Sequence, residues 1–268
     1  MIFSKQTIIQ RALEEDIGTG DITTEAIVPK HSTSTAVITS KEPGIIAGLN
    51  ILNDIFTKAS ITYHVKDGDR IKAGQRLAEI SGNTRYLLSR ERVALNFLRH
   101  LSGIATETSK YVTAVKNKAI ILDTRKTTPG LRKLEKYAVR MGGAQNHRMG
   151  LYDMVLIKDN HIKAADSIAK AVSLARMHTT KKIEVEIKSL SQLKDSMTAQ
   201  PDIIMLDNMS IDQMKAAVKI VNRQFPLEAS GNVTLANVKK IADTGVNYIS
   251  VGAITHSAKS LDISMDIL

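Results

Sequence analysis

Basic side chains stand directly after two short apolar runs in the middle of the sequence. The run Ile120–Leu122 is followed by Asp123–Lys126, and the run Met154–Ile157 is followed by Lys158–His161. A glycine-rich turn between them leads into Asn146–Arg148. The basic residues of this region are Arg125, Lys126, His147, Arg148 and Lys158.

Arginine binds a carboxylate or a phosphate through two parallel hydrogen bonds, whereas lysine acts as a point charge. Partly buried charges of one sign are tolerated only where carboxylates or an anionic ligand offset them. Asp123, Asp159, Glu186 and Asp207 offset part of this cluster, and the excess predicts a ligand that carries both carboxylate and phosphate groups. A lone histidine is as often structural as catalytic, so the residues leave the role of His147 open.

Two carboxylates, Glu186 and Asp207, close further apolar runs. They suit either a hard divalent cation such as Mg²⁺ or the hydroxyl groups of a sugar. Glu184 points the same way as Glu186 along an extended strand, and Glu186 lies nearer the carboxyl end. We therefore predict Glu186 as the residue that reaches the site.

Small residues form the turns after the last two apolar runs. Ser230–Asn232 follows one of them, and Gly252 follows the other. In a βα barrel, the corresponding turns commonly bind phosphate through backbone N–H groups. These turns predict the phosphate end of the site.

The second part of the chain alternates apolar strand candidates with amphipathic segments, which indicates repeated βα units and a parallel sheet. Every strand candidate ends in a polar or small residue that suits a ligand site. In an open sheet such groups gather at one switch point. In a barrel, the carboxyl ends of all strands surround the same opening. The pattern therefore favours a barrel. The strand candidates are 119–122, 154–157, 183–187, 203–206, 226–229 and 247–251.

The first part of the chain lacks this regular alternation, and we predict an α+β domain over residues 1–103. A helix is expected over 6–16, an extended stretch from Asp21, and a helix over 89–101 that Ser102–Gly103 interrupts. Residues 65–82 resemble a biotinyl-domain hairpin without its attachment lysine, and are interpreted as scaffold. Residues 104–268 are then the barrel domain, whose last residues are free to pack back on the first domain.

Composition narrows the function. The formal net charge is +10, but aromatic residues make up only 4% and tryptophan is absent, which disfavours base stacking and nucleic-acid binding. No apolar run approaches a membrane span, and no secretory signal is recognisable. Cysteine is absent, which fits a reducing compartment. We expect a cytoplasmic enzyme that acts on small anions.

Long motifs in this chain resemble one family, quinolinate phosphoribosyltransferase. The resemblance implies an amino-terminal α+β domain, an incomplete βα barrel of six to seven parallel strands, and a homodimer with shared active sites. The motifs are ALEEDIGTGDITT (12–24), ERVALNFLRHLSGIAT (91–106), DTRKTTPGLRKLEKYAVRMGGAQNHRMGLYD (123–153), LIKDNHI (156–162), EVEIKSLSQL (184–193), IIMLDN (203–208), LEASGNV (227–233) and ISVGAITHSAKSLDISMD (249–266).

The resemblance also implies a reaction in NAD biosynthesis. Quinolinate and phosphoribosyl pyrophosphate would give nicotinate mononucleotide, pyrophosphate and CO₂ with Mg²⁺. The implied quinolinate-binding residues are Arg125, Lys126, His147, Arg148, Lys158 and, from the partner subunit, Arg92. The implied residues for phosphoribosyl pyrophosphate are Lys126, Lys158, Glu186, Asp207, Ser230, Gly231, Asn232 and Gly252. Glu186 and Asp207 would also hold the metal, and both would act in catalysis together with Lys126 and Lys158.

One residue departs from the family pattern, and one motif separates this chain from a related group. Ala144 stands where a third glycine is usual, and it would cost about 1 kcal/mol if that position needed a positive φ. A related group associated with molybdenum transport usually reads Arg-Lys-x-Phe-Pro-Gly, whereas this chain has Thr128 before Pro129. A paralogue of that group, acting on a different anionic acceptor, is therefore the alternative function.

Overall fold

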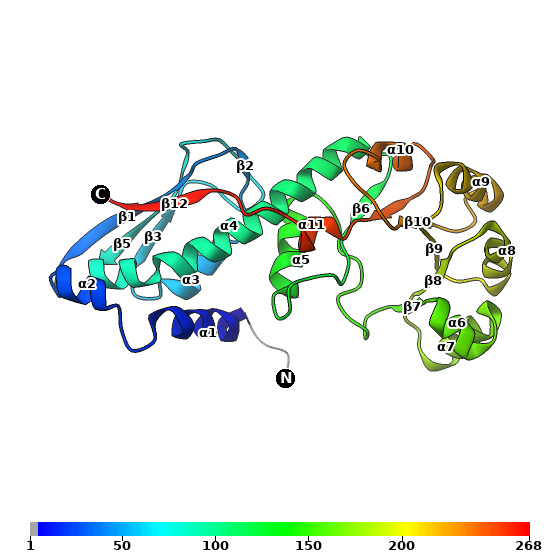
Figure 1. The fold of residues 1–268 in the computed structure, drawn as a ribbon, viewed down its shortest axis with the longest axis horizontal. Helices are drawn as coiled ribbons and strands as arrows, with labels where there is room; N and C mark the ends of the chain where they lie inside the picture. The colour runs from blue at the N-terminus through cyan, green and yellow to red at the C-terminus, as the bar shows by residue number, and fades with distance from the viewer. Residues whose placement is uncertain (1–4) are drawn as a thin grey trace. The chain divides into compact units, whose positions relative to one another are not determined.

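The computed structural model describes residues 5–268, and the chain forms two compact units (Figure 1). The first unit holds the residues up to Ser109 together with Thr128–Gly143 and Ala258–Leu268. The second holds Lys110–Thr127 and Ala144–Ser257. The first unit thus includes the chain's carboxyl-terminal segment, and a domain boundary at residues 103/104 stays a prediction.

The first unit is built on an antiparallel sheet in the order β12-β1-β5-β3. A short antiparallel pair, β2 and β4, and five helices complete the described part of this unit. The strands are β1 (Thr33–Ser40), β2 (Gly44–Ile45), β3 (Ser60–Tyr63), β4 (Arg70–Ile71), β5 (Arg76–Asn83) and β12 (Ile263–Ile267). The helices are α1 (Lys5–Ile17), α2 (Ile22–Ile27), α3 (Asn50–Ile55), α4 (Thr84–Val115), whose last turns enter the second unit, and α5 (Arg132–Met141).

Two sequence expectations in the first unit are wrong. Helix α2 begins where an extended stretch was expected, because the Asp21 side chain accepts the backbone N–H of Thr24 and caps the helix. Helix α4 runs through Ser102–Gly103 without interruption. A Cβ at Gly103 would overlap the backbone carbonyl of Lys259, so this glycine permits close packing of the carboxyl-terminal segment and does not end the helix.

The second unit contains a six-stranded parallel sheet in the order β6-β11-β10-β9-β8-β7. This order is that of a barrel opened between β6 and β7. The six predicted strands are confirmed. They are β6 (Ile120–Leu122), β7 (Val155–Ile157), β8 (Ile183–Ile187), β9 (Ile203–Asp207), β10 (Leu227–Ser230) and β11 (Tyr248–Ser250).

A single residue, Gln145, occupies the place of a seventh strand. It forms an isolated parallel bridge with Leu122, in which its N–H donates to the carbonyl of Ile121 at 3.0 Å. The preceding Gly143 takes the left-handed conformation at φ 90°, and Ala144 is not among the positive-φ residues. The strain considered for Ala144 is therefore absent.

Helices follow the strands of the second unit, and α7, α8 and α9 line the outer side of its sheet (Figure 1). A capping box between Ser210 and Gln213 opens α9. No helix in the described part of the chain is long and apolar enough to cross a membrane. The helices are α6 (Asp159–Ala165), α7 (Ile168–His178), α8 (Leu190–Ala199), α9 (Ile211–Val221), α10 (Val238–Ala242) and α11 (Ala253–His256).

Candidate active site

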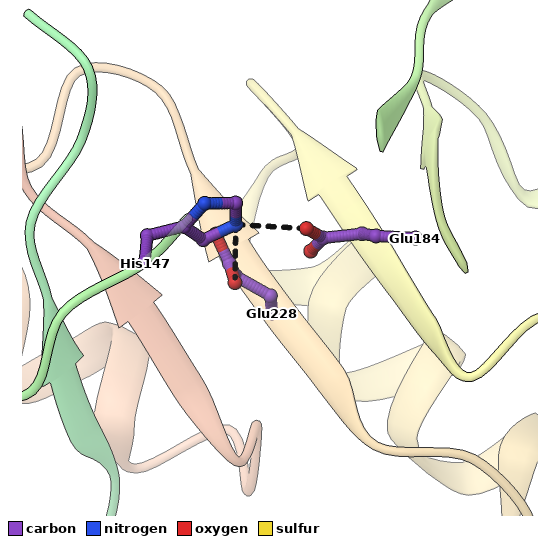
Figure 2. Close-up of side chains that lie close together, drawn as sticks. All are labelled: His147, Glu184 and Glu228. Atoms are coloured by element: carbon purple, nitrogen blue, oxygen red, sulfur yellow. Dashed lines mark hydrogen bonds and ion pairs between the residues drawn. The ribbon is translucent and has the colours of Figure 1, made fainter. Parts of the chain in front are cut away.

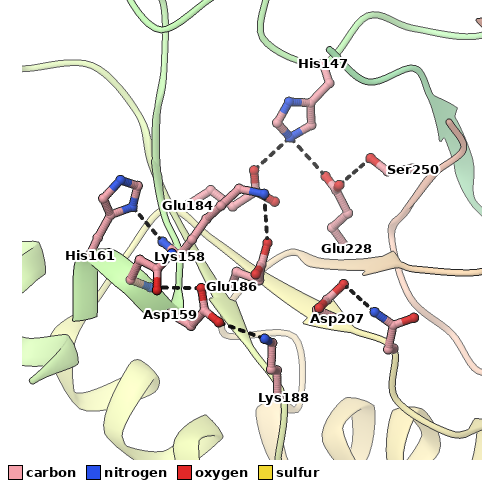
Figure 3. Close-up of polar contacts among 12 residues, drawn as sticks. His147, Lys158, Asp159, His161, Glu184, Glu186, Lys188, Asp207, Glu228 and Ser250 are labelled. Carbon is pink, nitrogen blue, oxygen red and sulfur yellow. Dashed lines mark hydrogen bonds and ion pairs between the residues drawn. The ribbon is translucent and has the colours of Figure 1, made fainter. Parts of the chain in front are cut away.

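The carboxyl ends of the parallel strands bring the predicted polar residues to one edge of the sheet (Figure 3). The register pairs Ser230 of β10 with Asp207 of β9, and Ile187 of β8 with Leu206 of β9. Glu186 precedes Ile187, and Lys158 follows the last residue of β7. This edge belongs to the second unit and is the candidate active site.

Lys158 and Glu186 form an ion pair, with Nζ 3.3 Å from Oε2. Glu186 is nearly buried, whereas the Lys158 side chain is half exposed. The backbone N–H of Lys158 donates to His161 Nδ1 at 2.9 Å, so His161 caps the start of α6. The Lys158 ammonium group faces the carboxylates of the strand ends.

His147 lies over two buried carboxyl groups (Figure 2). Its Nε2 is 2.8 Å from Glu184 Oε2 and 3.6 Å from Glu228 Oε2. Both glutamates are fully buried, and only 8% of the His147 side chain is exposed. Ser250 Oγ donates a short hydrogen bond to Glu228. The sequence left the role of His147 open, and the structure places its ring in this buried cluster.

The buried Asp123 fixes the backbone that carries His147. Its Oδ1 accepts the N–H of His147 at 2.9 Å, and its Oδ2 accepts the amide of Asn146 at 2.6 Å. Because Asp123 directly follows β6, the end of this strand fixes the position of the loop that carries His147. From the sequence, Asp123 was expected only to balance positive charge, and its structural role in the loop was missed.

Burial dominates the electrostatics of the carboxyl pair. It raises the pKa of Glu184 to about 7 and that of Glu228 to about 8. The negative charge of Glu184 raises the pKa of Glu228 further, and the His147 side chain opposes that rise. Burial and mutual repulsion therefore favour a neutral carboxyl group in this pair. Neither glutamate was predicted as a site residue. The available signal was a charged residue at an inward position of an otherwise apolar strand.

Arg125 and Arg148 are close enough for their charges to interact. Burial, followed by the charge of Arg125, lowers the pKa of Arg148. Arg148 Nη1 donates to the backbone carbonyl of Met154 at 3.3 Å, just before β7. Two guanidinium groups that repel each other in partly buried positions are stabilised by an anion between or above them. The predicted anion site therefore has a physical basis in this pair.

Lys126 extends across the turn after β11. Its carbonyl accepts the hydroxyl of Thr255 at 2.8 Å, and a Cβ added to Gly252 would lie 3.3 Å from Lys126 Cδ. The absence of a side chain at Gly252 thus leaves room for the lysine stem. The structure brings these two predicted residues together.

The loop Ser230–Asn232 is held by a residue that the sequence missed. Gly231 has φ +97°, and a Cβ there would overlap the Asn208 side chain. Asn208 Oδ1 accepts the amide of Asn232 at 3.0 Å, and Asn208 N–H donates to the carbonyl of Ser230 at 2.8 Å. Asn208 itself is left-handed at φ 54°. It directly follows Asp207, which is the only sequence signal for its role.

Glu186 and Asp207 are oxygen ligands at the ends of neighbouring strands, and Lys188 contributes positive charge near both. This donor set fits a hard cation that is shared with an anionic substrate. Among the described residues, the compact group of three potential metal ligands is instead His147, Glu184 and Glu228, whose ligand atoms lie within 4.8 Å of one another. That group lies in the buried cluster, and its Glu184 stands two residues before Glu186 on β8.

Arg92 is the predicted site residue that lies in the first unit. It stands on α4 with 56% of its side chain exposed, and Nη2 is 4.0 Å from Glu91 Oε1. The other predicted site residues belong to the second unit.

An open parallel βα barrel with guanidinium, ammonium and carboxylate groups at its strand ends defines an enzyme of the phosphate-binding βα-barrel class. Two family models match the chain, the amino-terminal domain of quinolinate phosphoribosyl transferase over residues 21–102 and its carboxyl-terminal domain over residues 104–266. The chain belongs to the quinolinate phosphoribosyltransferase family.

Relatives and solved structures agree with this family. The chain is 48% identical to a probable nicotinate-nucleotide pyrophosphorylase [carboxylating] of Bacillus subtilis, over 94% of this chain and 90% of that one. It is 45% identical to the Mycobacterium leprae enzyme of that name, over 97% and 95%. The structure of nicotinate-nucleotide pyrophosphorylase from Francisella tularensis superposes with a TM-score of 0.95 at 41% identity, covering 98% of this chain and 95% of that one.

Proposed function

We propose that this chain transfers the phosphoribosyl group of phosphoribosyl pyrophosphate to quinolinate, with loss of CO₂, to give nicotinate mononucleotide and pyrophosphate. The observation that carries the proposal is the meeting of two groups at one strand edge of a chain of this family. These are the basic residues around Arg148 and Lys158 and the carboxylates Glu186 and Asp207. Both substrates are polyanions, and such a mouth offsets their charge. The molybdenum-associated alternative finds no support among the relatives.

The quinolinate carboxylates are assigned to the guanidinium groups of Arg125 and Arg148, with Lys126 and Lys158 beside them. Arginine matches the geometry of a carboxylate through two hydrogen bonds, and the mutual repulsion of Arg125 and Arg148 adds to their affinity for an anion. We keep His147 in this group on the strength of its position next to Arg148. Its Nε2 faces the buried carboxyl groups, so only the rest of the ring is available to a substrate.

The ribose is assigned to Glu186 and Asp207, and the phosphate to Ser230–Asn232 and Gly252. Breaking the bond at the anomeric carbon creates positive charge on the sugar, which nearby carboxylates stabilise. Lys126 and Lys158 then stabilise the negative charge that develops on the departing pyrophosphate. Decarboxylation follows on the nucleotide: the C–C bond to the leaving CO₂ breaks, the adjacent cationic ring nitrogen stabilises the electron pair left on the ring carbon, and a proton from solvent binds there.

Mg²⁺ is proposed to bind at Glu186 and Asp207, where it would neutralise part of the pyrophosphate charge. Removing the metal with a chelator and adding it back tests this assignment. Activity that survives chelation would remove Mg²⁺ from the proposal.

A homodimer is proposed because Arg92 is assigned to the site of the partner subunit. Its exposed side chain on α4 is compatible with this role. A cytoplasmic location also remains a prediction, and cell fractionation would test it.

An acceptor-swap assay tests the proposed function. The protein is incubated with Mg²⁺ and phosphoribosyl pyrophosphate, and pyrophosphate release is measured with quinolinate, with nicotinate or with neither. Release that requires quinolinate is expected. Release with nicotinate alone would transfer the function to a paralogue with another acceptor, and no release with either acid would refute the proposal.

A further inference from the structure

The ring of His147 is held by groups that follow or belong to different strands of the second unit. Glu184 comes from β8, and Glu228 comes from β10. Ser250 of β11 donates to Glu228, and Asp123, after β6, accepts the N–H of His147. Figure 3 shows the side chains of His147, Glu184, Glu228 and Ser250 pointing toward one another. The position of one imidazole is therefore tied to the alignment of several strands.

The contacts favour the tautomer of His147 that carries a hydrogen on Nε2. Nε2 has two carboxyl groups at 2.8 and 3.6 Å, and a carboxylate can only accept. When Glu184 is ionised, Nε2 bears the hydrogen and donates it to Glu184. Rotating the ring by half a turn would replace this donor by a C–H group and leave the buried carboxyl groups without it.

Burying these carboxyl groups destabilises the fold. Glu184 Oε1 and Glu228 Oε2 are buried, and neither accepts a hydrogen bond from a donor outside the carboxyl pair. An unsatisfied buried polar group costs free energy, and a buried ionic cluster is often no better for stability than an apolar one of the same shape. The cluster lies beside Arg148 of the predicted anion site. Its cost in stability is explained by its effect on that site.

We infer that Glu184 and Glu228, with Ser250, are positioning residues that orient the His147 imidazole, and with it the neighbouring Arg148, for the dicarboxylate substrate. This role rests on the proposed function and assigns the carboxyl pair no contact with either substrate. The geometry that supports it is the 2.8 Å hydrogen bond from His147 to Glu184 and the anchoring of Glu228 by Ser250.

The test compares Glu184→Gln and Ser250→Ala with the wild-type enzyme. Glutamine keeps the size of Glu184 but presents an amide to the ring. We expect the KM for quinolinate to rise by about tenfold or more in Glu184→Gln, which is the effect of losing a hydrogen bond to a charged group. A smaller rise is expected in Ser250→Ala. The KM for phosphoribosyl pyrophosphate should stay within about twofold of the wild-type value. The variant weakens the binding of quinolinate alone, in the ground state and the transition state alike.

A matched control is Glu79→Gln in the first unit. Glu79 also pairs with a histidine, with its Oε1 3.2 Å from His64 Nε2. This variant should leave both KM values and kcat unchanged. The melting temperature separates positioning from a structural role, and that of Glu184→Gln should equal or exceed the wild-type value. A lower melting temperature with equal losses in kcat and both KM values would overturn the inference.

Nitrogen NMR of the histidine ring gives a readout that does not need activity. In the wild-type protein, His147 should show a protonated Nε2 hydrogen-bonded to carboxylate, and Glu184→Gln should shift that signal. An unchanged His147 signal would refute the inference even in an active enzyme. If the wild-type protein releases no pyrophosphate while the signal shifts as expected, the proposed function fails and the orientation of the ring stands.

Discussion

Arg148 and Glu186 belong to the same candidate site, but replacing them should change different kinetic constants. Arg148 is assigned to the substrate carboxylate, so Arg148→Ala should raise the KM for quinolinate by about tenfold or more, with a smaller effect on kcat. Glu186 is assigned to the ribose, where charge develops during bond cleavage, so Glu186→Ala should mainly lower kcat. Steady-state kinetics with each substrate varied in turn measures both. Unchanged kinetics in both variants would refute the assignment.

Glu228 makes the stability of the fold depend on pH. Burial raises the pKa of Glu228 in the folded protein to about 8 from its ordinary value of 4.5, so the folded protein holds a proton that the unfolded chain releases. The contribution of Glu228 to the free energy of unfolding is therefore largest below pH 4.5, and it is lost as the pH rises toward 8. His147, Glu184 and Ser250 face Glu228 within the cluster.

We expect the urea midpoint to fall between about pH 5 and 8, and Glu228→Gln should flatten this fall. Urea titrations of both proteins at several pH values measure the difference. A slope that is the same in the variant would show that other groups control the pH dependence.

At the scale of elements, the loop after β10 depends on one backbone conformation. Gly231 has φ +97°, and an added Cβ would overlap Asn208. Gly231→Ala should therefore displace Asn208 and the turn, and raise the KM for phosphoribosyl pyrophosphate several-fold while the KM for quinolinate changes little. Gly74→Ala is the control, since its φ is +76° but a Cβ there meets nothing within 4 Å. Equal kinetics in the two variants would contradict a phosphate-binding role for this loop.

The capping box of α9 supplies a prediction on stability alone. Ser210 accepts the N–H of Gln213 at 3.2 Å, and Gln213 accepts the N–H of Ser210 at 2.8 Å. Ser210→Ala should lower the free energy of unfolding by about 1 kcal/mol. The kinetic constants should not change, because α9 lies on the outer side of the sheet (Figure 1). Chemical denaturation and the activity assay on the same variant check both statements.

At the scale of the whole molecule, a site shared between subunits predicts complementation. Arg92→Ala and Glu186→Ala should each be nearly inactive, since each removes one part of every site. When the two variants are unfolded and refolded together, a mixed dimer regains one intact site, and random pairing should restore roughly a quarter of the wild-type activity. The same amount of each variant refolded alone is the control. No recovery in a refolded dimer would place Arg92 outside the shared site.

The amino-acid sequence determined the barrel and most of the predicted site residues. Strand periodicity and the residues at strand ends are local signals, so six runs that each end in a polar or small residue were enough to predict a parallel ring. The long motifs then identified the family. The sequence could not show that the ring stays open between β6 and β7, because Gln145 pairs as a single residue and leaves no periodic pattern.

Tertiary structure alone decided what surrounds each site residue. Glu184, Glu228 and Ser250 lie far apart in the sequence, and only the register of parallel strands gathers them beneath His147. Gly103 is a helix breaker by local propensity, yet packing of the carboxyl-terminal segment keeps it within α4. Propensity and motif are set by neighbours in the chain, whereas burial, pKa and hydrogen-bond partners depend on residues that only folding brings near.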